Sequence, residues 1–365
     1  MLVAQKKFNP GYRIRWEKRL VSTPLINFSI PVISIIMTLL AGGAVIAAMG
    51  FDPIFIFQGM FTSAFLSFTG LMETTVKAIP LILAGLGVAL AFKMLLWNIG
   101  AEGQLHMGAF AASGVALALP DAPAYIVLPT MILAGMVAGA LWASLPAIPK
   151  AYLGVNEIIT SLLLNYVAIF WIDYLVFGPW RDPAALGFPI TKAFGQAARL
   201  PMFGDTRVHT GLLIAIAAAI ALYIILYHSK WGCEIRVIGE SQGAARYAGM
   251  NIRRNIILVM MLSGALAGLA GMVEISAIHA RLQAGFSPGF GYTAIIIASL
   301  ARMHPGWVIL VSFLMSGLLV GGFSMQIHGL PVATVQMLQG AILFFLLGGN
   351  ILTRYRLTIR RKKVA

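Results

Sequence analysis

Apolar runs of about twenty residues constrain this chain more than any other feature of its sequence. A helix that crosses a bilayer needs about 20 mostly apolar residues, and runs of this kind recur along all 365 residues. Only 10% of the residues are charged and 59% are hydrophobic, whereas a soluble domain carries about 25% charged residues. The sequence therefore predicts an all-α polytopic membrane protein and excludes a soluble enzyme, a disordered chain and a coiled coil.

We expect about ten transmembrane helices, with the amino and carboxyl termini both in the cytoplasm. The third and eighth spans are short enough to be tilted, broken or re-entrant. The second to fifth and the seventh to tenth spans start on opposite sides of the membrane, which permits an inverted repeat of four helices. The expected spans are 29–50, 79–97, 104–119, 125–148, 156–177, 211–228, 256–277, 292–303, 306–325 and 332–350.

The Lys and Arg residues set the expected orientation. With both termini inside, the cytoplasmic segments hold 20 of the 26 basic residues and the outer segments hold six. This asymmetry follows the positive-inside rule. Twelve basic residues lie in the two terminal tails without the interleaved aromatic residues of a nucleic-acid surface. The net charge of +14 therefore indicates a lipid bilayer, and no nucleic acid, as the partner.

The expected spans also define the domain organisation. The chain divides into a basic cytoplasmic tail (1–28), a transmembrane domain (29–350) and a second basic cytoplasmic tail (351–365). Within the domain, we expect segment 51–78 at the outer surface, as an interfacial helix or a re-entrant piece. Residues 178–210 form an outer loop, and residues 229–255 form the longest cytoplasmic loop. Asp173 and Glu274 lie near the outer ends of their spans, where we expect them among lipid headgroups.

The sequence lacks the motifs of the common catalytic and metal sites. No Gly-Lys dipeptide occurs, so the chain has no Walker A loop for a nucleotide phosphate. The six His residues lack metal-ligand spacing, and the single cysteine, Cys233, allows no internal disulfide. The segment Gly239-Glu240-Ser241-Gln242-Gly243 matches the G-x-S-x-G pattern, but a nucleophile elbow needs a strand before it. We therefore expect no catalytic residue, metal ligand or cofactor on this chain.

A first polar cluster lies between the second and third spans. It reads Trp97-Asn98-Ile99-Gly100-Ala101-Glu102-Gly103-Gln104. A charged side chain at the centre of a membrane helix costs roughly 2.5–3.5 kcal/mol, so it usually faces a partner or a cavity. Two interpretations stay open: a cytoplasmic turn with Glu102 among headgroups, or a broken-helix element beside a transport path.

A second polar cluster opens the fifth span. Glu157, Ser161 and Asn165 recur at every fourth position, so they share one face of a helix, with Asn156 beside them. A polar stripe on an apolar helix should point into the bundle. It serves either interhelical hydrogen bonds, worth about 0.6 kcal/mol each, or a transport path.

Pairs of glycines four residues apart predict close contacts between helices. Such pairs place two glycines on one face of a helix and let a second backbone approach. The pairs are Gly135 and Gly139, Gly264 and Gly268, and Gly317 and Gly321.

The long cytoplasmic loop contains a predicted short helix between Ser241 and Gly249. Ser241 can cap its first turn, and Gly249 can take the left-handed position after its last turn. Ala244, Ala245 and Ala248 are small enough for another surface to approach closely. The segment is either an interfacial helix on the inner leaflet or a coupling helix that docks into a soluble motor protein.

Three stretches, Leu81–Gln104, Asn156–Tyr166 and Gly239–Asn251, resemble the permease subunits of bacterial ABC importers. Within the branch of branched-chain amino acid and ribose permeases, the chain is most similar to the larger permease of nucleoside and simple-sugar importers. The resemblance implies a multi-pass subunit of the bacterial cytoplasmic (inner) membrane. It also implies three partners: a second, homologous permease, a dimer of cytoplasmic ATPases that bind ATP and Mg²⁺, and an extracytoplasmic solute-binding protein.

The resemblance implies which residues contact the ATPase but gives no residue-level substrate site, so the candidates for the path lining come from the two polar clusters. The expected contacts with the ATPase are Glu240, Ala244, Ala245, Arg246 and Gly249. The expected lining of the translocation path is Asn98, Glu102, Gln104, Asn156, Glu157, Ser161 and Asn165.

Two alternative functions stay open. The first is an ion-coupled secondary transporter that works without an ATPase, with Glu102 or Glu157 as the proton site. The second is an intramembrane enzyme that uses Glu157 and His106.

Overall fold

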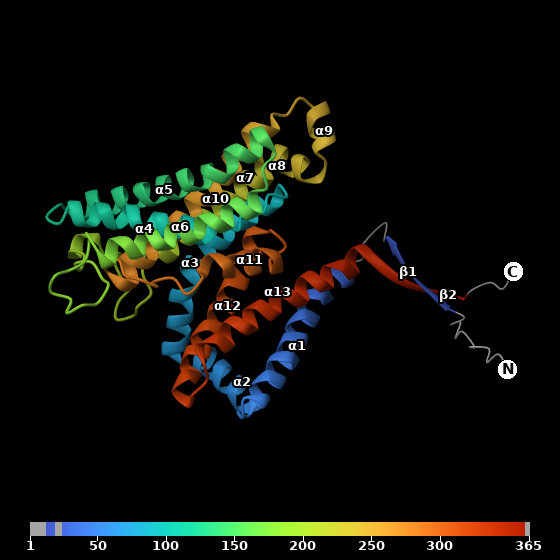
Figure 1. The fold of residues 1–365 in the computed structure, drawn as a ribbon, viewed down its shortest axis with the longest axis horizontal. Coiled ribbons are helices and arrows are strands. Elements are labelled where there is room, and N and C mark those ends of the chain that lie inside the picture. Colours follow the sequence, from blue (N-terminus) through green and yellow to red (C-terminus); the bar gives the residue numbers. More distant parts are fainter. Residues whose placement is uncertain (1–11, 19–23, 362–365) are drawn as a thin grey trace, which may run out of the picture. The chain divides into compact units, whose positions relative to one another are not determined.

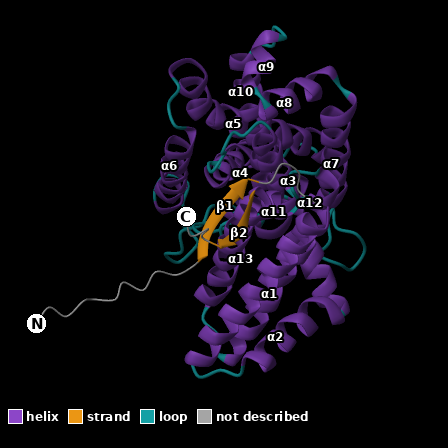
Figure 2. Cartoon of the chain, turned by 90° about the vertical axis from the view of Figure 1, so that its right-hand side faces the viewer, coloured by secondary structure: helices purple, strands orange, loops and turns teal. Residues whose placement is uncertain are grey.

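The computed structural model describes residues 12–18 and 24–361, with the side chains of residues 29–349. It is almost entirely helical (Figure 1; Figure 2), so the chain is an all-α polytopic membrane protein. The chain forms two compact units: the two chain ends, up to Pro53 and from Gln336, and the central part, Ile54–Val335. Of the expected basic tails, the residues at positions 1–11, 19–23 and 362–365 lie outside the described residues.

The elements follow one another along the chain with short connections. In order they are β1 (Tyr12–Lys18), α1 (Pro24–Ala48), α2 (Pro53–Phe61), the π-helix η1 (Thr62–Leu66), α3 (Phe68–Lys93), α4 (Ala101–Ala118), α5 (Ala124–Leu153), α6 (Glu157–Phe177), the 3₁₀-helix η2 (Gln196–Ala198), α7 (Gly211–His228), α8 (Lys230–Glu240), α9 (Gln242–Tyr247), α10 (Ile252–Glu274), the π-helix η3 (Ile275–His279), α11 (Phe290–Leu300), α12 (Pro305–Met325), the 3₁₀-helix η4 (Gln326–His328), α13 (Val332–Arg354) and β2 (Tyr355–Arg361).

Among the described residues, eight helices are long and apolar enough to cross a membrane. The two expected spans that are missing from this group are the short third and eighth ones, now α4 and α11. α11 has only 11 residues, and a helix of that length rises about 16 Å, half of the bilayer core. Of these two helices only α11 is too short, whereas α4 has 18 residues, as many as α7, and is missing from the group because its mean hydropathy is lower.

The segment 51–78 differs from its expected form. Only its first part is a separate short apolar helix, formed by α2 and η1, whereas α3 starts at Phe68 rather than at residue 79. Thr74, Val76 and Ala78 are buried inside the bundle, so this part does not lie at an interface. The helix was missed because Glu73 and Lys77 lower the local hydropathy, although both are ion-paired.

α3 and α10 form the centre of the Ile54–Val335 unit. About 89% of the apolar window of α3 is buried, and 78% of that of α10 with η3, against 28% for α5, α6 and α7. Some helices are apolar on every face but are buried on one face alone. Their other faces are available to lipid. The two central helices therefore carry the interior, and the helices around them carry the lipid-facing surface.

The glycine pairs bring these helices together, as the sequence predicted. A Cβ atom added at Gly139 of α5 would collide with the carbonyl oxygen of Gly264 of α10, and one added at Gly268 would collide with that of Gly135. Gly108 of α4 meets the Gly268 backbone in the same way. The three helices thus touch backbone to backbone, which only glycine permits.

The loop 178–210 is held against the segment that follows α10. The Thr191 backbone N–H donates to the Leu282 carbonyl oxygen at 2.9 Å, and the Ser276 hydroxyl donates to the Ala198 carbonyl oxygen at 2.7 Å. The loop is therefore part of the folded unit rather than a free connection.

The other unit pairs the two chain ends. β1 and β2 form an antiparallel two-stranded sheet in which Tyr12 lies opposite Arg361 and Lys18 opposite Tyr355. Within the same unit, Gly42 of α1 packs directly against Leu338 of α13. The sequence predicted only charged tails here, and the sheet is an addition to that prediction.

Candidate functional site

The break between α3 and α4 is held together by a pair of side-chain amides. Asn98 is fully buried, and its Nδ2 atom donates to Gln104 Oε1 while Gln104 Nε2 donates to Asn98 Oδ1, both at 2.9 Å. Asn98 Nδ2 also donates to the Ser263 hydroxyl of α10 at 2.9 Å. Leu95 reverses the chain just before this point, with φ at 57°. The amides therefore fix an irregular turn against a central helix.

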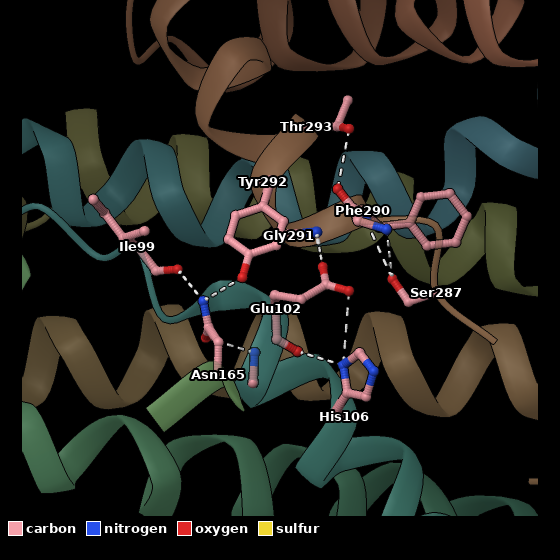
Figure 3. A network of polar contacts seen from close by, with 11 residues as sticks. Ile99, Glu102, His106, Asn165, Ser287, Phe290, Gly291, Tyr292 and Thr293 are labelled. Carbon is pink, nitrogen blue, oxygen red and sulfur yellow. Dashed lines mark hydrogen bonds and ion pairs between the residues drawn. The ribbon is translucent and has the colours of Figure 1, made fainter. Parts of the chain in front are cut away.

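Asn165 of α6 completes the first turn of α4 from outside (Figure 3). The Gly103 N–H donates to Asn165 Oδ1 at 2.8 Å, and Asn165 Nδ2 donates to the Ile99 carbonyl oxygen at 2.9 Å. Nδ2 also lies 3.3 Å from the Tyr292 hydroxyl of α11. The first N–H groups of a helix have no partner within it. Asn165 thus joins three helices by capping one of them.

Glu102 lies where the amino-terminal ends of α4 and α11 meet (Figure 3). Its Oε2 atom accepts a hydrogen bond from the Gly291 N–H at 2.6 Å. Its Oε1 atom lies 3.7 Å from His106 Nδ1, and that nitrogen is 2.8 Å from the Glu102 carbonyl oxygen. Each helix amino terminus carries a partial positive charge, which stabilises a nearby carboxylate. A Cβ at Gly291 would collide with the Glu102 backbone, so only glycine allows this approach.

This network lies deep in the bundle. Ser263, which binds Asn98, is near the middle of the apolar helix Ile252–His279. Glu102 is only 2% exposed, so the interpretation that places it among headgroups is wrong and the broken-helix interpretation fits the structure. Many transporters hold substrate where the amino termini of discontinuous helices meet near mid-bilayer. At this site the amino-terminal ends of α4 and α11 meet at the Glu102 carboxylate.

The polar stripe of α6 points into the bundle, as predicted. Glu157, Ser161 and Asn165 are all buried. Asn156 caps the helix by accepting from the Ile158 N–H at 2.9 Å, and Glu157 forms an ion pair with Lys150 of α5 at 2.7 Å. The stripe therefore starts with an inter-helix ion pair and ends in the amide network around α4.

The intramembrane-enzyme alternative has no matching geometry. Glu157 of α6 is paired with Lys150 of α5. His106 lies on a different helix, α4, where it is close to Glu102 of the same helix. Among the described residues, no group of three or more acidic, His or Cys side chains could hold a metal ion.

A second buried ion pair was not predicted. Glu274 was expected among headgroups, but its side chain is 1% exposed and accepts from Lys77 of α3 at 2.8 Å. His279 of η3 lies 3.4 Å from the same carboxylate. The buried Glu274 carboxylate is tolerated because Lys77, whose side chain is 28% exposed, offsets its charge. The sequence did carry a signal for this ion pair: one Lys and one Glu lie on two otherwise apolar spans.

The predicted coupling segment forms the short helix α9, which follows directly after α8 (Figure 1). The Ser241 hydroxyl caps it by accepting from the Ala244 N–H at 3.2 Å, and Gly249 follows it with φ at 73°. Both features were predicted. Glu240, Ala244, Arg246 and Gly249 are exposed, whereas Ala245 is fully buried. Ala245 therefore holds α9 to its own chain and is not available to a partner.

α8 connects α9 to the central helices. Trp231 Nε1 donates to Asn255 Oδ1 of α10 at 2.7 Å, and Asn255 Nδ2 donates to Glu234 Oε2 at 2.8 Å. A Cβ at Gly239 would collide with the carbonyl oxygen of Lys93, the last residue of α3. α8 is thus fixed to the start of α10 and to the end of α3, directly before the Asn98 turn.

Comparison with known proteins places this architecture in a family. Residues 70–347 match the family described as "Branched-chain amino acid transport system / permease component". The chain is 40% identical to a glucose ABC transporter permease protein of Haloferax volcanii, over 91% of this chain and 90% of that protein. It is 33% identical to a guanosine ABC transporter permease protein of Bacillus subtilis, over 88% of this chain and 93% of that protein. A nucleoside ABC transporter permease protein of Lactococcus lactis is 31% identical over 87% of this chain and 90% of its own length. The chain therefore belongs to this family of ABC transporter permease subunits.

Proposed function

We propose that the chain forms half of the translocation path of an ATP-driven importer for a neutral sugar or nucleoside. One observation carries the proposal. The relatives that align with the chain over about nine-tenths of their length are named as glucose, guanosine and nucleoside permeases. These solutes share an uncharged, hydroxyl-rich sugar ring. A path for them needs weak, reversible hydrogen bonds rather than fixed charges.

The energy for import comes from partner chains. The sequence has no Walker A loop, so ATP and Mg²⁺ belong to a dimer of cytoplasmic ATPases and this chain is not itself an enzyme. A second, homologous permease supplies the other half of the path, and an extracytoplasmic binding protein delivers the solute. In this arrangement the chain lies in the bacterial cytoplasmic membrane, with both termini and α9 on the inner side.

α9 is the contact with the ATPase. The exposed residues in and next to α9 present an anion, Glu240 at the end of α8, a cation, Arg246, and two small residues, Ala244 and Gly249, to a partner groove. α8 carries a displacement of α9 to the end of α3, where Gly239 touches Lys93. The Asn98 turn follows within a few residues, so a push from the motor reaches the broken-helix element directly.

The seven path residues then fall into two roles. Asn98, Gln104 and Asn165 hold the turn and the α4 amino terminus through buried hydrogen bonds. These bonds define one of the two states between which the path alternates. The remaining four border the route along α6 and at Glu102; they are Glu102, Asn156, Glu157 and Ser161.

The test is uptake by cells that carry the complete transporter with an Arg246→Glu, Gly249→Pro double variant of this chain. The variant reverses the charge of α9 and removes its left-handed turn, where proline cannot reach the required φ. We expect normal membrane insertion and at least a ten-fold loss of ATP-dependent glucose or guanosine uptake.

The matched control is Arg302→Glu, which reverses a charge in a different turn between helices. It should transport normally. Normal uptake by the double variant would contradict the coupling role of α9.

Purification in mild detergent distinguishes an ATP-driven importer from a secondary transporter, because the proposal requires an ATPase to copurify. Uptake by the chain alone, driven by an ion gradient, would favour the secondary-transporter alternative.

A further inference from the structure

A cavity of about 280 Å³ lies beside the Glu102 network, between α4, α6 and the segment that precedes α11. Glu102 and His106 form one end of it, and Asp173, Phe177 and Ala284 border the rest. Ligand pockets in proteins start at about 300 Å³, so the space suits one small ring rather than a large solute. All of these residues belong to the Ile54–Val335 unit.

Most polar side chains of this cavity can accept hydrogen bonds, and Ser287, whose hydroxyl accepts from the Gly289 and Phe290 N–H groups, can donate one. His106 Nδ1 lies 2.8 Å from the Glu102 carbonyl oxygen, which can only accept, so Nδ1 carries the proton. The other ring nitrogen, Nε2, is then an acceptor. Glu102 uses Oε2 for the Gly291 N–H, while Oε1 is 3.7 Å from the imidazole, beyond hydrogen-bond length. Asp173, which was expected among lipid headgroups, is half-buried and borders this cavity.

The rest of the wall is apolar. Ile169, Ile172 and Phe177 of α6 line it along one side. A sugar ring has hydroxyl donors around its rim and C–H groups on its faces. A cavity lined by acceptors and by apolar side chains is complementary to that distribution, because each buried hydroxyl needs an acceptor.

We propose that this cavity is a binding subsite for the sugar ring of the transported solute, either a hexose or the ribose of a nucleoside. Glu102, His106 and Asp173 accept hydrogen bonds from ring hydroxyls, and the apolar face of α6 covers the ring. The proposal rests on the proposed function, since it assumes that the chain transports such solutes. It adds the place where the ring binds and the groups that recognise it.

The charges of the cavity select against other solutes. Two carboxylates repel an anion such as a sugar acid. Glu102 is already stabilised by the Gly291 N–H and by the α11 amino terminus, which weakens its attraction for a cation. A neutral polyol is therefore the best match, and an amino sugar is the informative competitor.

The test is protection of an engineered cysteine in the purified full-length chain, reconstituted in lipid nanodiscs. Ala284→Cys places a thiol on the cavity wall, in a Cys233→Ser background that removes the natural thiol. We expect glucose, ribose and guanosine to slow labelling by a maleimide at least three-fold. Gluconate, which has the same size and a negative charge, should leave the rate unchanged. The natural Cys233 in the otherwise unaltered chain is the control, because it is exposed and far along the sequence from the cavity.

A matched pair of variants tests the recognising groups. Asp173→Asn in the Ala284→Cys chain replaces one acceptor oxygen by a donor, and the glucose concentration for half-protection should rise about ten-fold. Asp205→Asn makes the same change in an exposed outer turn and should have no effect. Guanosine but not glucose protection identifies a nucleoside as the source of the ring, and the reverse identifies a hexose.

Three results would overturn the proposal: no protection by any neutral sugar or nucleoside, equal protection in the Asp173→Asn chain, or much stronger protection by glucosamine than by glucose. The labelling needs no ATPase, so its outcome is independent of transport. Protection without ATP-driven uptake would refute the proposed function and keep the subsite. Uptake without protection would refute the subsite and keep the proposed function.

Discussion

Asn165 is the residue on which the local structure of the site depends most. Replacing it by alanine leaves the Gly103 N–H and the Ile99 carbonyl group buried without their partner. An unsatisfied buried polar group costs about 1–3 kcal/mol. We expect Asn165→Ala to lower the midpoint of thermal unfolding by several degrees in detergent.

The matched control is Asn251→Ala. Asn251 caps α10 by accepting from the Arg254 N–H, but it is exposed, so water can replace it. Its loss should cost about 1 kcal/mol. An equal effect of the two variants would show that Asn165 acts only as a local cap.

His209 gives the stability of the outer loop a pH dependence. Burial lowers the pKa of His209 from 6.5 to about 4, with Glu274 opposing and Lys77 adding to this shift. The folded state therefore binds fewer protons than the unfolded state between pH 6.5 and 4. The free energy of unfolding should fall in this window as the pH is lowered, by about 1.4 kcal/mol per pH unit at most.

The variant that isolates this effect is His209→Asn. Asparagine can still accept a hydrogen bond from the Gly211 N–H, as His209 Nδ1 does at 3.2 Å, but it does not titrate. Unfolding midpoints measured from pH 7.5 to 5 should depend less on pH in this variant than in the unaltered chain. His328→Asn, at an exposed site, should keep the original dependence. A dependence unchanged by His209→Asn would contradict the assignment.

At the residue scale, the sequence predicted which residues matter but not how they are used. The spacing of Glu157, Ser161 and Asn165 correctly placed them on an inward face. The partners of Asn98 and Glu102 could not be predicted, because Ser263 and Gly291 are more than 150 positions away along the chain. The ion pair of Lys77 and Glu274 escaped prediction for the same reason.

At the scale of elements, the contact between α5 and α10 tolerates the least additional side-chain volume. Gly139→Ala places a methyl group where the Gly264 carbonyl oxygen lies, so the helices must separate. We expect a loss of about 2 kcal/mol or more of stability, as for an overpacked core. The readout is the thermal unfolding midpoint in detergent.

The control for this prediction is Gly340→Ala in α13, where an added Cβ meets nothing within 4 Å. It should be neutral or stabilising by about 1 kcal/mol, because alanine favours the helix. Equal destabilisation by both substitutions would mean that helix propensity, and not close packing, explains the glycine pairs.

Element types were predictable because length, hydropathy and caps are local properties. Ser241 and Gly249 fixed the bounds of α9, and most spans matched helices within a few residues. The start of α3 was not predictable, because the ion pairs that neutralise Glu73 and Lys77 form only in the fold. The strands β1 and β2 do carry a signal: Ile14 and Trp16 alternate with arginines and a glutamate. This alternation was not interpreted as strand structure, because both segments lie in basic tails.

At the scale of the whole molecule, a buried polar network and an exposed candidate docking helix occupy different parts of one chain. The Glu102 network and the cavity beside it lie among the central helices, whereas α9 is exposed and tied to them through α8. This separation is what a permease needs when its energy comes from another protein.

The natural cysteine allows the orientation to be tested without altering the chain. Cys233 is exposed in α8, next to α9, and no second cysteine occurs in the sequence. A membrane-impermeant maleimide should fail to label it in intact cells and should label it in inside-out vesicles. Labelling of Cys233 from outside intact cells would place α9 on the wrong side for an ATPase and would contradict the account.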